Sequence, residues 1–127
     1  MTTPVVTATK EFPIEDVAKL MFDNRIGSVV IVSEEGKIEG IVTERDMIYA
    51  IAKNKVGKGI PVYTIMTENP ITADPDEPLI DAVRKMREVK IRHLPVVKDG
   101  IPIGMVSLRD IIEVMAYLIS GGEHLGR

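Results

Sequence analysis

The sequence predicts a mixed α/β fold of the α+β type, built from two pseudo-symmetric β-α-β-β-α repeats that pack through their sheets. The spacing of apolar residues switches between a period of two, typical of strands, and 3.6, typical of helices. The chain also matches itself at a shift of 65 positions, which becomes 64 after a turn that is one residue shorter in the second copy. The matched pairs include Met21 with Met86, Ile26 with Ile91, Val32 with Val97, Gly40 with Gly104, and Asp46 with Asp110.

Each copy is expected to open with an extended segment followed by a helix. The extended segments run near Val6 and Ile71, and a proline, Pro13 or Pro78, stands where each helix starts. Proline suits a helix start because the first amides of a helix have no partner within it. Apolar residues then recur at helical spacing, and they are Ile14, Val17, Ala18 and Met21 in the first copy and Leu79, Ala82, Val83 and Met86 in the second.

Two strands are expected next in each copy. Residues 28–32 and 94–97 are short, β-branched and almost continuously apolar, which is typical of strands covered on both faces. Turns containing Gly36 and Gly100 then reverse the chain into a second strand. These second strands are expected over residues 38–42 and 101–106.

A final helix closes each copy, over about residues 43–53 and 107–119, and residues 55–61 form the one linker-like stretch. We therefore divide the chain into a first repeat, 1–60, and a second repeat, 61–127, with a frayed tail over 121–127. A repeat of roughly 60 residues buries only a modest fraction of its surface alone. The two repeats are therefore expected to share a core and form one module, with two related clefts between them.

The amino-acid composition argues against several classes of binding partner. Sixteen basic and nineteen acidic residues give a net charge of −3, so no broad positive surface is expected to attract nucleic acid or anionic lipid. Three Tyr, two Phe and no Trp are too few for platforms that stack bases. The absence of cysteine excludes disulfides, thiol catalysis and cysteine zinc sites. Since no apolar run is long enough to span a bilayer, we expect a cytoplasmic protein without a membrane or nucleic-acid partner.

A Gly-hydrophobic-hydrophobic-Thr/Ser-x-x-Asp stretch occurs in both copies, over residues 40–46 and 104–110. Met66-Thr67 before Ile71-Thr72, the helix containing Ala82, and the segment 93–97 (His-Leu-Pro-Val-Val) complete an ordered set. In these residues the chain resembles the paired cystathionine-beta-synthase (CBS) domains that form a Bateman module. The resemblance covers nearly the whole chain.

The resemblance implies a regulatory module that binds AMP, ADP, ATP or S-adenosylmethionine as a signal, energy sensing included, with no required cofactor. It also implies a homodimer formed through helical faces and an effector protein that receives the signal. It does not identify which adenosyl compound binds, how many sites are filled, which protein is the effector, or whether the dimer is parallel or antiparallel.

The repeated motif has a chemistry of its own. Thr43 and Ser107 carry hydroxyls at a helix entrance, and Asp46 and Asp110 follow one turn later. A carboxylate there can accept both hydroxyls of a ribose, and the free amides of a helix N-terminus suit a phosphate. By resemblance, the two acids hold the ribose and the two hydroxyls address ribose or phosphate. The extended segments near Val6 and Ile71 would supply main-chain groups and aliphatic walls to the adenine.

Positive groups are the second set of candidates. Arg92 and His93 align with Gly27 and Ser28 of the first copy, at a loop that by resemblance faces the pocket. A guanidinium and an imidazole there could contact phosphates. Arg45 and Arg109, inside the two motifs, are candidates for the same role.

Three alternatives stay open. Thr-x-x-Asp and Ser-x-x-Asp also resemble a helix capping box, which needs no ligand. The module could serve only in structural homodimerisation or protein interaction, with empty pockets. Independent catalysis is the third class, but the sequence contains no HExxH, GxSxG or Walker-type motif, and we expect no enzyme activity and no metal site.

Overall fold

The computed structural model describes residues 5–121, which contain four α-helices. The first unit comprises β1 (Thr7–Ala8), α1 (Ile14–Asn24), β2 (Ser28–Val32), β3 (Ile38–Thr43) and α2 (Glu44–Ala52). A 3-10 helix, η1 (Val62–Thr64), and β4 (Thr67–Glu68) follow, and the second unit comprises α3 (Leu79–Val89), β5 (His93–Lys98), β6 (Ile101–Ser107) and α4 (Leu108–Ile119). The predicted tail beyond Gly121 lies outside the described residues.

The strands form two sheets with the same register in the two copies. One sheet has the order β1-β2-β3-β4, in which β1 is parallel to β2 and the other pairs are antiparallel; β5 and β6 form the second. Ser28 lies opposite Thr43 as His93 lies opposite Ser107. A bulge interrupts β2 between residues 31 and 32 and β5 at the equivalent positions, 96 and 97. The two copies of the predicted tandem repeat therefore share even this local irregularity.

The extended segment of the second copy pairs more weakly than that of the first. β1 pairs with β2 at two positions, whereas the second copy makes a single isolated bridge between Ala73 and Val96. Pro70 and Pro75 flank this segment, and a proline has no amide hydrogen to donate to a neighbouring strand. The expected strand near Ile71 is thus reduced to one bridged residue.

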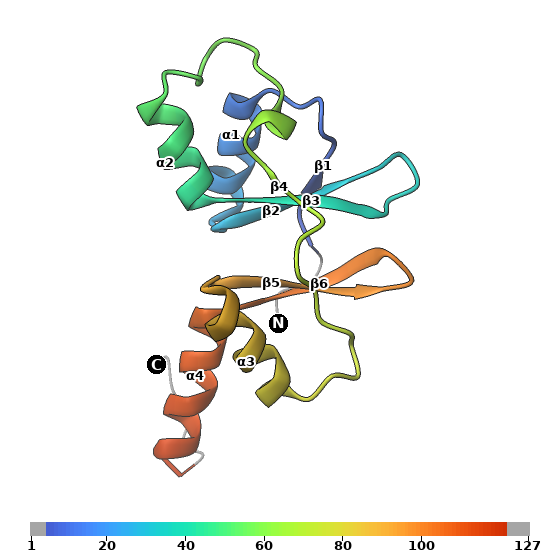
Figure 1. Cartoon of the computed structure of the whole chain (residues 1–127). Helices are drawn as coiled ribbons and strands as arrows, with labels where there is room; N and C mark the ends of the chain where they lie inside the picture. The colour runs from blue at the N-terminus through green and yellow to red at the C-terminus, as the bar shows by residue number, and fades with distance from the viewer. Residues whose placement is uncertain (1–4, 122–127) are drawn as a thin grey trace.

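The two units pack face to face through their sheets, with the helices outside (Figure 1). Val30, Val32 and Ile41 of the first sheet form one buried cluster with Met105 of the second. The Ile38 amide donates to the Gly100 carbonyl across the interface at 2.8 Å. This confirms the predicted packing through sheets.

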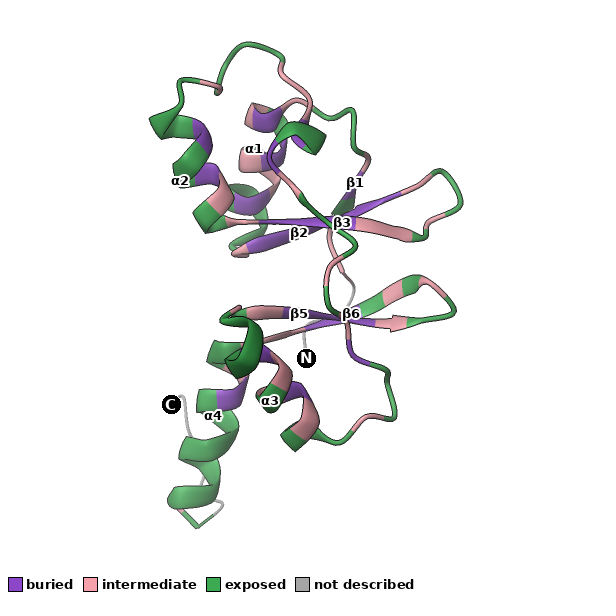
Figure 2. Cartoon of the chain, viewed as in Figure 1, coloured by how far each residue is buried: buried purple, intermediate pink, exposed green. Residues whose placement is uncertain are grey.

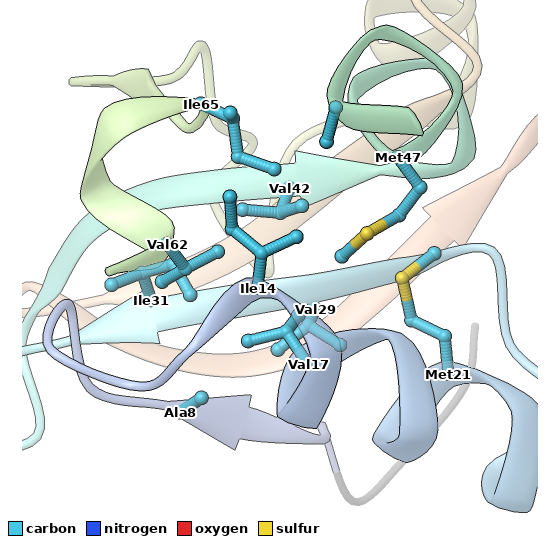
Figure 3. Close-up of a cluster of buried hydrophobic side chains, with 11 residues drawn as sticks. Ala8, Ile14, Val17, Met21, Val29, Ile31, Val42, Met47, Val62 and Ile65 are labelled. Atoms are coloured by element: carbon cyan, nitrogen blue, oxygen red, sulfur yellow. The ribbon is translucent and has the colours of Figure 1, made fainter. Parts of the chain in front are cut away.

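Strand β2 is buried along its whole length, as Figure 2 shows, because both of its faces are covered. Val29 and Ile31 point to a core shared with α1 and α2, whereas Val30 and Val32 face the other unit. Figure 3 shows that first core, in which Met21 and Met47 come from the two helices. A second core lies under α3 and α4, and its members are Ala73, Ala82, Met86, Leu94, Val96 and Ile111.

Residues 62–68 lie on the first unit. Val62 and Ile65 join its core, and β4 adds to its sheet by pairing with β3. Neither η1 nor β4 is predicted by the sequence patterns. The boundary between the two repeats, placed at residue 60, refers to the duplicated sequence and stays a prediction.

The linker before η1 is attached to α1 by Glu15. Its carboxylate accepts the Gly57 and Gly59 amides at 3.1 and 2.8 Å. The pKa of Glu15 is lowered first by a hydrogen bond from its own amide and then by these two bonds. Both glycines have positive φ, a conformation that side chains with a Cβ rarely adopt.

A substitution at Gly40, where β3 and β4 approach closely, tests the pairing of these strands. A Cβ at Gly40 would lie 2.7 Å from Met66 Sδ and 2.9 Å from the Thr67 carbonyl oxygen, so β4 would have to move away. We expect Gly40→Ala to lower the free energy of unfolding by about 1–3 kcal/mol, the usual cost of overpacking, measured by urea denaturation. Glu39→Ala, at the neighbouring half-exposed position, is the control. Equal stability of the two variants would contradict the role of this close approach.

Candidate functional site

A cleft of about 1530 Å³ opens between the two units and contains most of the predicted site residues. Its walls come from the segment before β1, the end of α1, the start of β2, the start of β5 and the first turns of α4. The predicted residues that line it are Val6, Gly27, Ser28, Arg92, His93, Ser107, Arg109 and Asp110. Residues distant in sequence and from both repeats therefore meet at one site.

The remaining predicted residues, Thr43, Arg45, Asp46 and Ile71, do not line this cleft. Thr43 ends β3, while Arg45 and Asp46 lie in the first turn of α2. Ile71 is exposed. Of the two motif acids, only Asp110 of the second repeat lines the cleft, whereas the extended wall around Val6 comes from the first repeat.

Asp110 and Ser107 form a capping box at the start of α4. The Ser107 amide donates to Asp110 Oδ2 at 2.9 Å, and the Asp110 amide donates to Ser107 Oγ at 3.1 Å. The capping interpretation is therefore confirmed. Within residues 5–121 the cap leaves Asp110 Oδ1 without a hydrogen-bond partner, so one carboxylate oxygen stays available inside the cleft.

Asp46 and Thr43 form the equivalent cap at α2. Asp46 Oδ2 accepts the Thr43 amide at 2.9 Å and the Thr43 hydroxyl at 3.3 Å. Burial raises the pKa of Asp46, and the two bonds from Thr43 and the nearby Arg45 partly offset that effect. Both caps hold the Asp carboxylate on the amide of the N-cap residue, but the Thr43 hydroxyl donates to Asp46 whereas the Ser107 hydroxyl accepts the Asp110 amide. Only the cap at α4 borders the cleft.

His93, the first residue of β5, lines the cleft. Partial burial lowers its pKa, and Arg92 adds to this, whereas the Glu44 and Asp110 carboxylates act in the opposite direction. His93 is therefore predominantly neutral near pH 7, and its ring can accept one hydrogen bond and donate another.

The cleft also holds residues that the sequence analysis missed. Glu44, the first residue of α2, reaches it from the first unit, and the aliphatic side chains of Val5, Ile26 and Met105 form part of its wall. Glu44 follows Thr43 directly, so its position in the motif was a usable signal. No sequence pattern indicates that Met105 lines the cleft, because its place there depends on the packing of one sheet on the other.

Within residues 5–121 there is no group of three or more His, Cys, Asp or Glu side chains arranged to hold a metal ion. In the same region no helix combines the length and the apolar character that crossing a bilayer requires.

The sequence matches the CBS domain family over residues 1–53 and 62–117, and the chain belongs to that family as a tandem CBS pair. An uncharacterized protein of Methanopyrus kandleri is 36% identical over 118 residues, 91% of this chain and 60% of its own length. The chain thus spans less than two thirds of that relative.

Two solved structures share the fold. The CBS domain pair of protein MJ0100, in complex with 5′-methylthioadenosine and S-adenosyl-L-methionine, has a TM-score of 0.85 and 35% identity, covering 91% of each chain. A CBS domain protein from Pyrobaculum aerophilum complexed with AMP has a TM-score of 0.85 and 31% identity, covering 94% of this chain and 92% of its own. Both solved pairs thus hold adenosine-containing molecules.

His93 gives the stability a specific pH dependence. Because its folded-state pKa lies below the ordinary 6.5, protonation favours the unfolded chain, so its full contribution is present above pH 6.5 and declines as the pH falls below it. We expect the wild type to lose more stability than His93→Gln between about pH 7.5 and about pH 5.5, measured by urea denaturation. Parallel profiles for the two proteins would contradict this assignment.

Proposed function

We propose that this CBS pair is a regulatory module whose cleft binds an adenosine-containing ligand, with Asp110 accepting the ribose hydroxyls. The observation that carries the proposal is the position of Asp110, whose Oδ2 caps α4 while Oδ1 has no hydrogen-bond partner within residues 5–121. Hydrogen bonds to a charged acceptor contribute about 1.5–3 kcal/mol each, enough to retain a ribose.

The rest of the cleft suits the other parts of such a ligand. Val6, Ile26 and Met105 offer an aliphatic surface to the adenine, which agrees with a chain poor in aromatic residues. The first turn of α4 presents amides at the positive end of the helix dipole, next to the Ser107 hydroxyl. The solved pairs with S-adenosylmethionine, 5′-methylthioadenosine and AMP support the ligand class and leave the choice among its members open.

The two motif acids are proposed to differ in function. The sequence alone assigned equal roles to Asp46 and Asp110, but only Asp110 lines the cleft. We therefore propose the cleft beside Asp110 as the principal site and treat Asp46 as a helix cap.

Asp110→Ala tests the ribose contact, with Asp46→Ala as the matched control that removes an equivalent cap. We expect Asp110→Ala to weaken binding of S-adenosylmethionine or AMP tenfold or more, by isothermal calorimetry, because a hydrogen bond to a charged group is lost. Asp46→Ala should lose about 1 kcal/mol of stability, as capping variants do, and keep its affinity.

Equal affinity of Asp110→Ala and the wild type would reject the ribose assignment. If the wild type binds no adenosyl compound at all, this result favours the alternative, a structural or protein-interaction module with empty pockets. A thermal-shift panel separates these cases, since ligand at about 100 times its dissociation constant stabilises a protein by roughly 2.7 kcal/mol.

The output of the module is proposed to travel through self-association or an effector protein. Helices α2 and α4 expose apolar side chains at equivalent positions of the two repeats, Ile48 and Ile51 in one and Ile112 and Met115 in the other. Figure 2 shows α4 exposed along most of its length. A second copy of the chain, packed through these faces, would bury them.

A charge on each helix tests this dimer. We expect the wild type to sediment as a dimer and the double variant Ile48→Asp with Ile112→Asp to sediment as a monomer, because a buried unpaired carboxylate disfavours association. Ile80→Asp, which alters an exposed isoleucine of α3, is the control and should leave the dimer intact. A monomeric wild type at high concentration would contradict the proposal.

A further inference from the structure

Glu44 is a carboxylate of the cleft that the repeated motif does not explain. Glu44 begins α2, and its amide donates to the Gly27 carbonyl at 3.1 Å. Its side chain lies so close to Gly27 that an added Cβ there would overlap Glu44 Oε1, and the same Cβ would lie 3.1 Å from His93 Cε1. Glycine at position 27 therefore leaves room for the Glu44 carboxylate beside the His93 ring.

The second repeat has no acid at the equivalent position. Leu108 occupies it, and the Leu108 amide donates to the Arg92 carbonyl at 2.9 Å, which repeats the backbone bond between Glu44 and Gly27. The backbone geometry is conserved between the repeats while the side chain differs in charge. The carboxylate is thus a local feature of this cleft and not part of the fold.

Glu44 is an exposed residue, and no cation within residues 5–121 pairs with its carboxylate. Within residues 5–121 its carboxylate makes no hydrogen bond and no ion pair, although the His93 pKa responds to its charge. Four carboxylates and three guanidiniums line the cleft. One of those guanidiniums, Arg109, already pairs with Glu113 at 3.4 Å. A ligand carrying several negative charges would add to the acidic excess, whereas a cation would reduce it.

The orientation of the ligand follows if the proposed function is correct, and the inference rests on it. With the ribose on Asp110 and the adenine against the aliphatic wall, the 5′ substituent would extend toward the polar side chains of the cleft, which include Glu44, Arg92 and His93. The carboxylates of Glu44 and Asp110 come from opposite repeats, and the charges of both act on His93 in this cleft. We infer that Glu44 is a specificity-determining residue, which makes the cleft prefer an adenosyl ligand with a cationic 5′ substituent, such as a sulfonium, over adenosine 5′-phosphates.

The test compares two ligands that differ by one methyl group and one positive charge, S-adenosylmethionine and S-adenosylhomocysteine. Calorimetry on the full chain should give at least about fivefold tighter binding of the sulfonium, the effect of one partly solvated charge pair. In Glu44→Gln this ratio should fall below about twofold, and AMP should bind about threefold more tightly than to the wild type. Glu88→Gln, which removes the same charge from an exposed position on α3, should behave as the wild type.

The outcomes separate this inference from the proposed function. If neither sulfur compound nor AMP binds the wild type, the proposed function fails. If all three bind and Glu44→Gln leaves the ratio of affinities unchanged, the cleft holds adenosyl ligands but Glu44 does not select among them, and the inference is overturned. Thermal unfolding of both variants checks that the helix that Glu44 begins remains folded.

Discussion

The face-to-face packing of the two sheets is the constraint on which the rest of this structure depends. Each unit alone would leave one sheet face in water, whereas the pair buries Val30, Val32, Ile41 and Met105 together. Burial of apolar surface contributes about 25 cal/mol per Å², so this interface stabilises the pair in proportion to the apolar area it buries. The cleft has walls from both units and therefore exists only when they are packed. Any ligand that bridges them would stabilise this arrangement through its higher affinity for it.

The start of α4 shows how one residue can serve both stability and recognition. Asp110, which lines the cleft, uses one carboxylate oxygen to satisfy an amide of the helix entrance, and among the described residues the other oxygen has no hydrogen-bond partner. The capping and ligand interpretations of the motif are therefore compatible at this helix. At α2 the same cap is made by Asp46, away from the cleft. The shared local geometry explains why the motif persists in both copies, and only its surroundings distinguish them.

The asymmetry between the copies concentrates polar groups at one cleft. Arg92 and His93 of the second repeat line the same cleft as Gly27 and Ser28 of the first, and Glu44 reaches it from α2. Duplication alone would have produced two equal clefts with equal charges. Divergence at a few positions on an unchanged backbone allows one cleft to acquire its own electrostatic character, because side chains at strand and helix ends do not alter the core.

The order of the elements, the tandem repeat and the capping motifs could be predicted from the sequence because each depends on local spacing: apolar periodicity, prolines at helix starts, and Ser or Thr three residues before Asp. The cleft could not be assembled in the same way. That Asp110 shares a cleft with Val6 while Asp46 does not, and that Glu44 lies near His93, depends on how one sheet rests on the other. That residues 62–68 lie on the first unit depends on the packing of Val62 and Ile65 into its core. Contacts between residues far apart in the chain arise from packing of whole elements, and no local pattern in a single sequence encodes which of two equivalent positions will face a shared cavity.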